Sequence, residues 1–381
     1  MTLISGDWLT AGATQAVMDM LENAGHQAYF VGGCVRNALL ETPVNDIDIA
    51  TDAWPEQVMG LAAKAGLKAI GTGIEHGTVT VVSDGTPYEI TTYRRDLKTD
   101  GRRAVVAFSG DIAEDAARRD FTMNALYADR HGTVLDPLGG LDDLQNRRVR
   151  FIDDANARIR EDYLRILRFF RFHAWYGDPG EGLDGAALAA IGENLDGLAG
   201  LSRERVGAEI KKLLAASDPA PAVGAMVQAG VFGHVLPGAD ARFLALLVHF
   251  EGPRRADPIR RLAVLGGPDP SEKLRLSRAD GRQWNMLRSE MATTEPVAVL
   301  GYRHGATLAV DIALLRAAIF EQPPAGDVDE QAARGQAQVF PVEAADLMPG
   351  LQGAALGERL KELELQWVAS DFSLTKAHLL D

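Results

Sequence analysis

Two aspartates set two positions apart are the first residues in the sequence that could do chemistry. Asp46 and Asp48 alternate with the apolar Ile47 and Ile49. If this stretch is a β-strand, both carboxylates share one face about 7 Å apart while the isoleucines enter the core. Carboxylates at that spacing repel each other unless a cation lies between them, and Mg²⁺ prefers such oxygen ligands. The pair predicts a magnesium site, although two solvent-facing aspartates on an amphipathic strand would show the same pattern.

A double glycine precedes these aspartates. Residues 27–31 read as a short strand, which runs into Gly32, Gly33 and then a predicted helix that carries Arg36. Glycines let a backbone approach phosphate oxygens, a helix N-terminus offers unpaired N–H groups, and an arginine adds a charged fork. Alone, a double glycine is commonly just a tight turn. Together with the carboxylate pair, it predicts a cradle for a triphosphate.

A third carboxylate is expected from a neighbouring strand. Residues 78–82 and 88–93 alternate like strands, and Gly85-Thr86-Pro87 between them predicts a hairpin turn. Glu89 lies in the second of these strands and is the best candidate. With Glu89 beside Asp46 and Asp48, two metal ions could activate a hydroxyl and stabilise a departing pyrophosphate.

The elements that position these groups form a small α/β region. Residues 1–140 mix strand patterns with helical spacing at 14–24, 35–40 and 55–65, whereas the chain from about residue 154 onward is helical in pattern. A chain of 381 residues is too long for one ordinary core. We therefore expect a mixed-sheet head followed by an all-helical remainder.

The composition indicates the cellular compartment in which the protein is expected. Cys34 is the only cysteine, which excludes an intramolecular disulfide and a cysteine-based zinc site. The sequence has no apolar run of about eighteen residues and no evident signal peptide at its start. These features favour a cytoplasmic protein without a membrane partner.

Charge is the feature that argues against a nucleic-acid partner. The net charge is −14, whereas a nucleic-acid binder usually carries excess positive charge. Recognition needs only a local cationic stripe, however, and residues 147–173 hold eight arginines against four carboxylates. An RNA path would start near this segment; the alternative is a solvated helical face.

Several motifs, in this order along the chain, resemble one family. They are Val31-Gly32-Gly33-Cys34-Val35-Arg36, Asp46-Ile47-Asp48-Ile49-Ala50-Thr51, Arg118-Arg119-Asp120-Phe121-Thr122-Met123-Asn124-Ala125-Leu126, Asp136-Pro137-Leu138-Gly139-Gly140, Glu161-Asp162-Tyr163-Leu164-Arg165 with the arginine-rich stretch to Phe172, and Leu201-Ser202-Arg203-Glu204-Arg205-Val206. They resemble polymerase-β-like nucleotidyltransferases, and more narrowly the class II CCA-adding enzymes and their poly(A) polymerase relatives. The glycine-rich residues 71–81 resemble the CCA-adding branch, which favours tRNA as the substrate. Asn37 departs from the aspartate usual in the family.

The resemblance implies a domain plan and a reaction. It implies a polymerase-β-like catalytic head over residues 1–145, a nucleotide-reading helical neck over 146–208, an RNA-binding helical body over 209–320 and a tRNA-binding helical tail over 321–381. The implied activity is Mg²⁺-dependent addition of CMP and AMP, from CTP and ATP, to the 3′ end of tRNA. The alternatives are a poly(A) polymerase, an enzyme that adds only CC or only A, a nucleotidyltransferase for small molecules, and a non-catalytic RNA-binding protein on the same fold.

The arginine-rich segment suggests how bases are chosen. Residues 161–175 read as one helix, with Asp162, Arg165 and Arg168 opposite an apolar stripe. Cytosine and adenine present an amino donor beside a ring-nitrogen acceptor, which a carboxylate and a guanidinium match, while guanine and uracil present the reverse pattern. Asp162 and Arg165 are therefore predicted to read the base; the alternative is a surface ion pair between them.

The remaining arginines are assigned to the nucleotide. Arg168 and Arg171 are expected to hold the triphosphate, and Arg119 is expected to contact the nucleotide from the head. Phe169 and Phe172 are expected to pack between layers, with base stacking as the alternative. By resemblance, the arginines at positions 94, 95, 102 and 103 flank a flexible loop over 97–104 that orders the incoming nucleotide.

Overall fold

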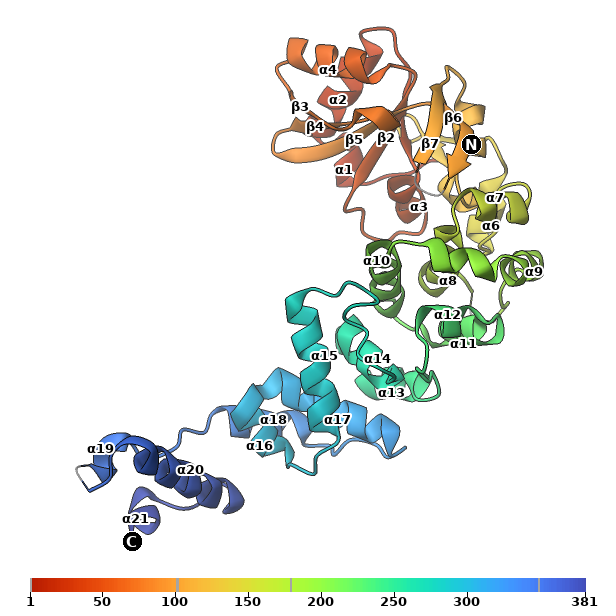
Figure 1. The fold of residues 1–381 in the computed structure, drawn as a ribbon. Coiled ribbons are helices and arrows are strands. Elements are labelled where there is room, and N and C mark those ends of the chain that lie inside the picture. Colours follow the sequence, from red (N-terminus) through yellow and green to blue (C-terminus); the bar gives the residue numbers. More distant parts are fainter. Residues whose placement is uncertain (1, 101–102, 179, 349) are drawn as a thin grey trace. The chain divides into compact units, whose positions relative to one another are not determined.

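The computed structural model describes residues 2–100, 103–178, 180–348 and 350–381 (Figure 1). The chain divides into two compact units, Met1–Pro237 and Gly238–Asp381. The first unit holds the sheet and the helices that follow it, and the second is built from helices. The predicted division into head, neck, body and tail is finer than these two units and stays a prediction.

A seven-stranded mixed sheet forms the centre of the head. Its strands are β1 Ala28–Val31, β2 Ile47–Thr51, β3 Lys68–Gly73, β4 Thr78–Ser83, β5 Thr86–Thr92, β8 Tyr127–Ala128 and β9 Val134–Leu135. They run in the order β3-β4-β5-β2-β1-β8-β9, in which β2 and β5 are parallel and the other neighbours antiparallel. The hairpin predicted between residues 78 and 93 is confirmed as β4 and β5. The mixed sheet with flanking helices is the fold class that the sequence predicted.

The head helices flank this sheet. They are α1 Asp7–Thr10, α2 Gly12–Glu22, α3 Gly33–Leu39, α4 Pro55–Lys64, α5 Ile112–Ala117 and α6 Gly140–Gln145, with short 3-10 turns at Ile74–His76 and Thr122–Asn124. Helices α2 and α4 contact β4, and α3 contacts β1 and β2. Because α3 follows β1 directly, the start of α3 lies beside the strand that carries Asp48.

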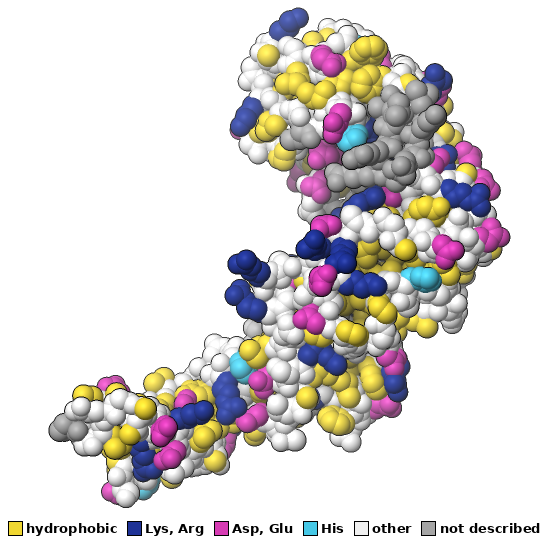
Figure 2. All heavy atoms as spheres, viewed as in Figure 1, with side chains coloured by type: hydrophobic (Ala, Val, Ile, Leu, Met, Phe, Trp, Pro, Cys, Tyr) yellow, Lys and Arg dark blue, Asp and Glu magenta, His cyan; other side chains and the backbone are white. Residues whose placement is uncertain are grey.

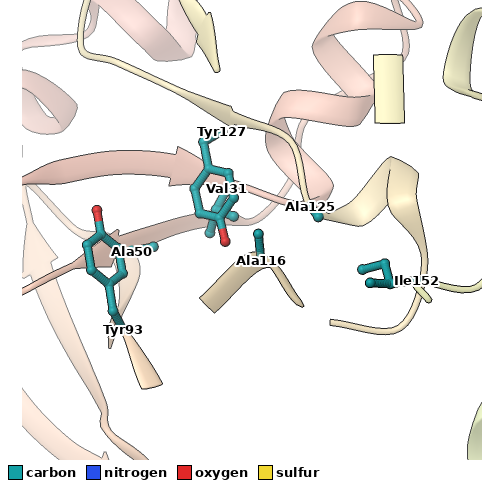
Figure 3. Close-up of a cluster of buried hydrophobic side chains, with 7 residues drawn as sticks. All are labelled: Val31, Ala50, Tyr93, Ala116, Ala125, Tyr127 and Ile152. Carbon is teal, nitrogen blue, oxygen red and sulfur yellow. The ribbon is translucent and has the colours of Figure 1, made fainter. Parts of the chain in front are cut away.

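A cluster of buried hydrophobic side chains forms part of the core of the first unit (Figure 3). The cluster consists of Val31, Ala50, Tyr93, Ala116, Ala125, Tyr127 and Ile152. Tyr93 and Tyr127 are fully buried. A buried tyrosine hydroxyl usually has a hydrogen-bond partner, and the Tyr127 hydroxyl donates to Asp115 Oδ2 at 2.7 Å. This core fixes the ends of β1 and β2 that carry the candidate site.

The segment predicted as a flexible loop is a two-stranded ribbon. Strands β6 Arg94–Asp100 and β7 Arg103–Phe108 pair antiparallel, so the prediction of a loop over 97–104 was wrong. The β-branched Val105 and Val106 favour a strand, and pairing extends that preference into the polar residues opposite them. Arg102 lies outside the described residues, and the predicted role of these arginines stays a prediction.

The helices that complete the first unit follow the sheet in sequence. They are α7 Ala155–Glu161, α8 Leu164–Tyr176, α9 Gly185–Glu193, α10 Arg203–Leu214, α11 Ala220–Gln228 and α12 Val231–Val235, with a 3-10 turn at Leu195–Gly200. Phe169 and Phe172 are both buried. Phe169 packs against the rings of Phe121 and Phe151, and Phe172 packs against those of Phe121 and Tyr176. Their predicted packing between layers is confirmed.

The single helix predicted over residues 161–175 is interrupted. Asp162 has φ −156° and ψ 104°, outside the helical region, and α7 ends at Glu161 while α8 begins at Leu164. The Asp162 side chain accepts a hydrogen bond from the Leu164 backbone N–H at 3.1 Å. Aspartate favours such caps over helix interiors because its carboxylate competes for backbone N–H groups. Asp162 therefore lies at a junction between two helices.

The second unit is helical, as predicted for the later part of the chain. Its helices are α13 Leu244–Glu251, α14 Pro258–Leu265, α15 Arg278–Met291, α16 Val297–His304, α17 Ala306–Ile319, α18 Val328–Gln336, α19 Ala344–Leu347, α20 Gly353–Ala369 and α21 Lys376–Leu380. Within it, buried Glu251 pairs with Arg260 and Arg261, and Arg260 also pairs with Asp311. Among the described residues of the whole chain, no helix has the length and apolarity to cross a membrane.

Candidate active site

Strands β2 and β5 place Asp48 and Glu89, two of the three predicted carboxylates, on one face of the sheet. In their parallel pairing Asp48 is the register partner of Glu89, so the two side chains point to the same side. Ile47 and Ile49 are 8% and 0% exposed, and the predicted alternation is confirmed. Asp46 precedes β2 and is exposed. The sequence prediction that these carboxylates neighbour one another therefore agrees with the register.

An open cavity of about 350 Å³ lies over this face. It is lined by Asp46, Ile47, Asp48, Thr80, Pro87 and Glu89. Burial raises the pKa of Asp48 to about 6, and the negative charges of Glu89 and Asp46 add to the rise. A cation between these groups would relieve both causes.

The donor set fits a hard divalent cation such as Mg²⁺, because it offers carboxylate oxygens next to open space for water and phosphate ligands. This fit rests on the oxygen chemistry of the side chains and on the register of Asp48 with Glu89. Among the residues that the structure describes, no three acidic, histidine or cysteine side chains converge on a common point. Asp46, Asp48 and Glu89 thus line one cavity, and their side chains would have to turn toward each other to share an ion.

The glycine turn stands at the end of β1. Gly32 has φ 70° and ψ −115°, a conformation that glycine alone adopts without strain. A Cβ at this position would lie 3.5 Å from Nη1 of Arg119, so this arginine approaches the turn closely. Gly33 then begins α3. The structure therefore brings Arg119 next to the turn formed by Gly32 and Gly33, and the phosphate cradle predicted there stays a prediction.

Two buried groups hold Arg119 in that position. Its Nη2 donates to Asp115 Oδ2 at 2.9 Å, and its Nε lies 3.2 Å from the Tyr127 hydroxyl. Burial alone would raise the pKa of Asp115, but Arg119 and Arg118 lower it to about 2. Asp115 is therefore ionised at neutral pH and anchors the guanidinium by charge.

Arg36 is almost fully buried, with 6% of its surface exposed. It donates to the Asn124 side chain, to Asn37 Oδ1 at 3.1 Å and to the Tyr176 hydroxyl at 2.9 Å. Its guanidinium also stacks on the Tyr176 ring, 4.1 Å from the centroid. Burial lowers the pKa of Arg36 from its usual value. Asn37, the departure from the family pattern, thus fixes the neighbouring arginine by a hydrogen bond.

Three arginines surround one aromatic ring at this point. The guanidinium carbons of Arg36, Arg168 and Arg171 lie 5.2, 5.3 and 4.6 Å from the centroid of Phe172. Two of them are held by carboxylates, since Arg168 pairs with Asp120 at 2.5 Å and Arg171 with Glu209 at 2.5 Å. The predicted phosphate-binding arginines of α3 and α8 therefore gather in one place.

The two predicted base-reading residues each have another partner. Asp162 pairs with Arg205 of α10 at 2.5 Å, while Arg165 pairs with Glu161. Arg165 also donates to the carbonyl oxygens of Arg158 and Arg118, at 2.9 and 3.1 Å. Among the ion pairs that the structure describes for these two residues, none joins Asp162 to Arg165, which was the alternative to base reading. Their role as base readers stays a prediction.

Sequence reasoning missed the residues that hold the site together. They are Asp115, Asp120, Asn124, Tyr176, Arg205 and Glu209. Arg205 and Glu209 stand one helical turn apart on α10 and therefore share a face. For Glu209 that spacing was the one signal available, whereas Arg205 also lies in the Leu201–Val206 motif. Asp115 stands four residues before Arg119, and Asp120 and Asn124 lie within the Arg118–Leu126 motif. The contact of Tyr176 with Arg36 joins residues distant in sequence, for which the sequence held no signal.

Family profiles match two parts of the chain. The Poly A polymerase head domain matches residues 28–150, and the family described as a probable RNA and SrmB-binding site of polymerase A matches residues 183–243. The first match contains Gly32, Arg36, the three carboxylates and Arg119. The second contains Arg205 and Glu209.

Curated relatives align with the first part of the chain. The CCA-adding enzyme of Leuconostoc citreum is 42% identical over 226 residues, covering 59% of this chain and 54% of the relative. The human mitochondrial CCA tRNA nucleotidyltransferase 1 is 42% identical over 201 residues, covering 52% of this chain and 46% of the relative. The chain thus spans about half the length of the curated relatives that it matches.

Solved structures extend the likeness along the chain. The CCA-adding enzyme of Bacillus stearothermophilus, crystallised with CTP, is 30% identical with a TM-score of 0.78, covering 94% of this chain and 93% of that one. The Thermotoga maritima CCA-adding enzyme in complex with tRNA is 18% identical with a TM-score of 0.68, which shows a shared fold. With its site geometry, its head-domain match and these neighbours, the chain belongs to the class II CCA-adding enzyme family, a branch of the tRNA nucleotidyltransferases and poly(A) polymerases.

Proposed function

We propose that this protein adds CMP and AMP to the 3′ end of tRNA, using CTP and ATP and releasing pyrophosphate, without a nucleic-acid template. The observation that carries the proposal is the register of Asp48 with Glu89 on the face next to the glycine turn. Acidic groups there can hold a divalent cation, proposed to be Mg²⁺, while a triphosphate lies on the turn. The family membership supports the same reaction.

The chemistry is an in-line displacement at the α-phosphorus of the nucleotide. The 3′ oxygen of tRNA forms the new P–O bond, the bond to the pyrophosphate oxygen breaks, and the hydroxyl proton leaves to solvent or a nearby base. When bound, the divalent cation makes the hydroxyl more acidic and stabilises the charge on the phosphoryl oxygens. Asp46, Asp48 and Glu89 supply the oxygen ligands for it.

The arginines orient the nucleotide. Arg119, held by Asp115 and Tyr127, faces the Gly32 turn and contributes a fixed positive charge to the triphosphate. Arg36, Arg168 and Arg171 contribute three more from around Phe172. Preorganised charges of this kind need no rearrangement during the reaction and are most effective away from bulk water.

Asp162 and Arg165 are proposed to read the base. Asp162 would accept from the exocyclic amino group that cytosine and adenine share, and Arg165 would donate to the adjacent ring nitrogen. In the free protein Glu161 holds Arg165 and Arg205 holds Asp162. Each side chain is therefore held in place by its partner before a nucleotide arrives.

The deciding experiment offers each labelled nucleoside triphosphate to purified protein with tRNA that lacks its last three nucleotides. CCA addition predicts two cytidines followed by one adenosine, with no incorporation of G or U. Homopolymeric adenosine would assign a poly(A) polymerase, and a product stopped at CC or lacking C addition would assign a partial enzyme. Absence of incorporation alongside tRNA binding would assign a non-catalytic RNA-binding protein. We propose the cytoplasm as the compartment, in keeping with the single cysteine, Cys34.

A further inference from the structure

A closed ring of side-chain contacts connects helix α3, which begins at the glycine turn, with two points on α8. From Arg36 of α3 the contacts run through Asn124 to Asp120, with 2.8 Å between Asn124 Nδ2 and Asp120 Oδ1. Asp120 then accepts from Nε of Arg168 at 2.7 Å, which brings the chain of contacts to α8. The ring closes where Nη2 of Arg36 donates to the hydroxyl of Tyr176, the last residue of α8. Two points of one helix are thereby tied to one arginine.

Phe172 packs inside this ring of contacts. Arg168, Phe172 and Tyr176 are spaced by four residues and therefore share one face of α8. The centroids of the Phe172 and Tyr176 rings are 5.4 Å apart, and the guanidinium groups of Arg36 and Arg168 lie over the Phe172 ring. Phe172 is buried, so the groups packed on it cannot move closer together. The contacts thus form a frame of fixed size.

Arg36 has only neutral partners within this frame. On the face that Figure 2 shows, Lys and Arg side chains are interspersed with Asp and Glu side chains. Arg36 is buried, and among the residues that the structure describes no ion pair joins it to a carboxylate. It donates to Asn124, Asn37 and Tyr176, while its buried Nε has no hydrogen-bond partner in the described part of the chain. A buried charge without a counter-charge costs the folded protein stability, and a bound anion would offset that cost.

The guanidinium of Arg36 lies against the glycine turn. A Cβ at Gly33 would stand 3.8 Å from Nη2 of Arg36, and one at Gly32 would stand 3.5 Å from Nη1 of Arg119. The turn ends β1, which pairs with β2 on the side away from β5. In the proposed reaction the α-phosphate lies next to the carboxylates of β2 and β5. The turn is therefore left for the β- and γ-phosphates, the part of the nucleotide that departs as pyrophosphate.

We propose that Tyr176 is a positioning residue that holds Arg36 at the glycine turn for the β- and γ-phosphates, and that it thereby sets the preference for nucleoside triphosphates over monophosphates. The inference rests on the proposed function and names a residue that determines one part of its substrate choice. Tyr176 acts through its hydroxyl, which accepts from Nη2 at 2.9 Å, and through its ring, on which the guanidinium stacks. A neutral partner orients the guanidinium and leaves its charge for the phosphates. Because no base is involved, CTP and ATP are affected alike.

The test compares triphosphates with a monophosphate in the absence of tRNA. Tyr176→Phe removes the hydroxyl and keeps the ring. The Kd values of CTP, ATP, inorganic pyrophosphate and CMP are measured by isothermal titration calorimetry with Mg²⁺ present. CTP, ATP and pyrophosphate are expected to bind the variant about fivefold more weakly, as for the loss of one hydrogen bond, whereas the Kd of CMP should stay nearly the same. Tyr176→Leu also removes the stacking and should weaken the same three ligands further.

A matched control separates this role from the general loss of a tyrosine hydroxyl. Tyr302→Phe removes a hydroxyl that contacts Glu364 in the second unit, and it should leave all the Kd values unchanged. A double-mutant cycle then shows whether Tyr176 acts through Arg36. The variant Arg36→Lys/Tyr176→Phe should bind CTP about as weakly as Arg36→Lys alone, because the hydroxyl has no further effect once its guanidinium partner is gone.

The outcomes that overturn the inference differ from those that overturn the proposed function. Equal losses for CTP and CMP would assign Tyr176 a purely structural role, and unchanged affinities in both Tyr176 variants would also contradict the proposal. Additive losses in the double variant would show that Tyr176 does not act through Arg36. If the unmodified protein prefers CTP to CMP and the variants lose this preference, the inference stands even where no nucleotide is added to tRNA. If tRNA is extended and the variants keep the preference, the inference alone is wrong.

Discussion

Asp48 of β2 lies in register with Glu89 of β5, so that two carboxylates from strands far apart in sequence face the same cavity. This relationship turns an Asp-x-Asp pattern into a candidate metal site. Parallel pairing between β2 and β5 sets the register, and the buried Ile47 and Ile49 prevent a slip by one residue, because a slip would expose both isoleucines.

Removal of a strand carboxylate should abolish transfer. For Asp48→Ala or Asp46→Ala we expect a loss of nucleotide incorporation on the order of 10³-fold or more, since a divalent cation supplies several kcal/mol of stabilisation. The Kd for tRNA should change little, because the phosphate contacts lie elsewhere. Asp84→Asn, in the exposed turn between β4 and β5, is the control and should remain active. Full activity of Asp48→Ala would remove the carboxylates from the mechanism.

The raised pKa of Asp48 predicts a pH-dependent cation affinity. With a pKa of about 6, Asp48 is mostly protonated at pH 5 and ionised at pH 7.5, and only the ionised form binds a cation well. At subsaturating Mg²⁺ the activity should therefore rise between pH 5 and 7, and a higher Mg²⁺ concentration should move the midpoint to lower pH. A midpoint independent of Mg²⁺ would assign the titration to another group.

The same shift makes a prediction about stability. A carboxyl whose pKa is raised by folding favours the folded state at acid pH, and that contribution is lost as the pH rises through about 6. Mg²⁺ should compensate above that pH by binding the ionised group. The rise in Tm on addition of Mg²⁺ should therefore be larger at pH 7.5 than at pH 5, and this difference should vanish in Asp48→Asn.

Asp162 should govern the choice of nucleotide. Asp162→Ala should incorporate G or U at rates closer to those of C and A, since the acceptor for the amino group is lost. Its partner Arg205 is partly exposed, so the loss of stability should be small. Asp196→Ala, at an exposed position of the first unit, should keep the selectivity. Unchanged selectivity in Asp162→Ala would assign base reading to other residues.

Asp115 should act through Arg119. In Asp115→Asn the guanidinium of Arg119 loses its charged anchor, so the KM for CTP and ATP should rise. Arg119→Lys should raise the same KM values, and the double variant should raise them by less than the two single effects combined. Breaking this buried pair should also cost about 3 kcal/mol of stability. Asp143→Asn is the control, because Asp143 is equally buried but pairs with Arg150 and Thr122. A similar KM rise in the control would show that lost stability explains both.

Local patterns predicted much of the head. Alternation at residues 46–50 and 78–93, together with the turn at residues 85–87, gave strands that the sheet confirms. Glu89 was predicted as the third carboxylate because it lies in a strand expected to neighbour that of Asp48, and the pairing of β2 with β5 places the two residues in register. The prediction of Gly32 as a special turn rested on residue type, and its φ of 70° bears that out.

Contacts at long range limited the prediction elsewhere. Asp162 interrupts the helix because its side chain caps the next one and pairs with Arg205, which is 43 residues away. The run from residue 97 is polar like a loop, and it is a strand because it pairs with β7. The anchors of Arg36 and Arg119 likewise come from Tyr176 and Tyr127, whose positions depend on the assembled fold.

The most direct measurement follows labelled CTP and ATP onto tRNA lacking CCA, with the unmodified protein and Asp48→Ala side by side. The unmodified protein should add two cytidines and one adenosine in the presence of Mg²⁺, while Asp48→Ala should bind the same tRNA and add nothing. Equal incorporation by both proteins would contradict the role of the strand carboxylates on which the proposed reaction depends.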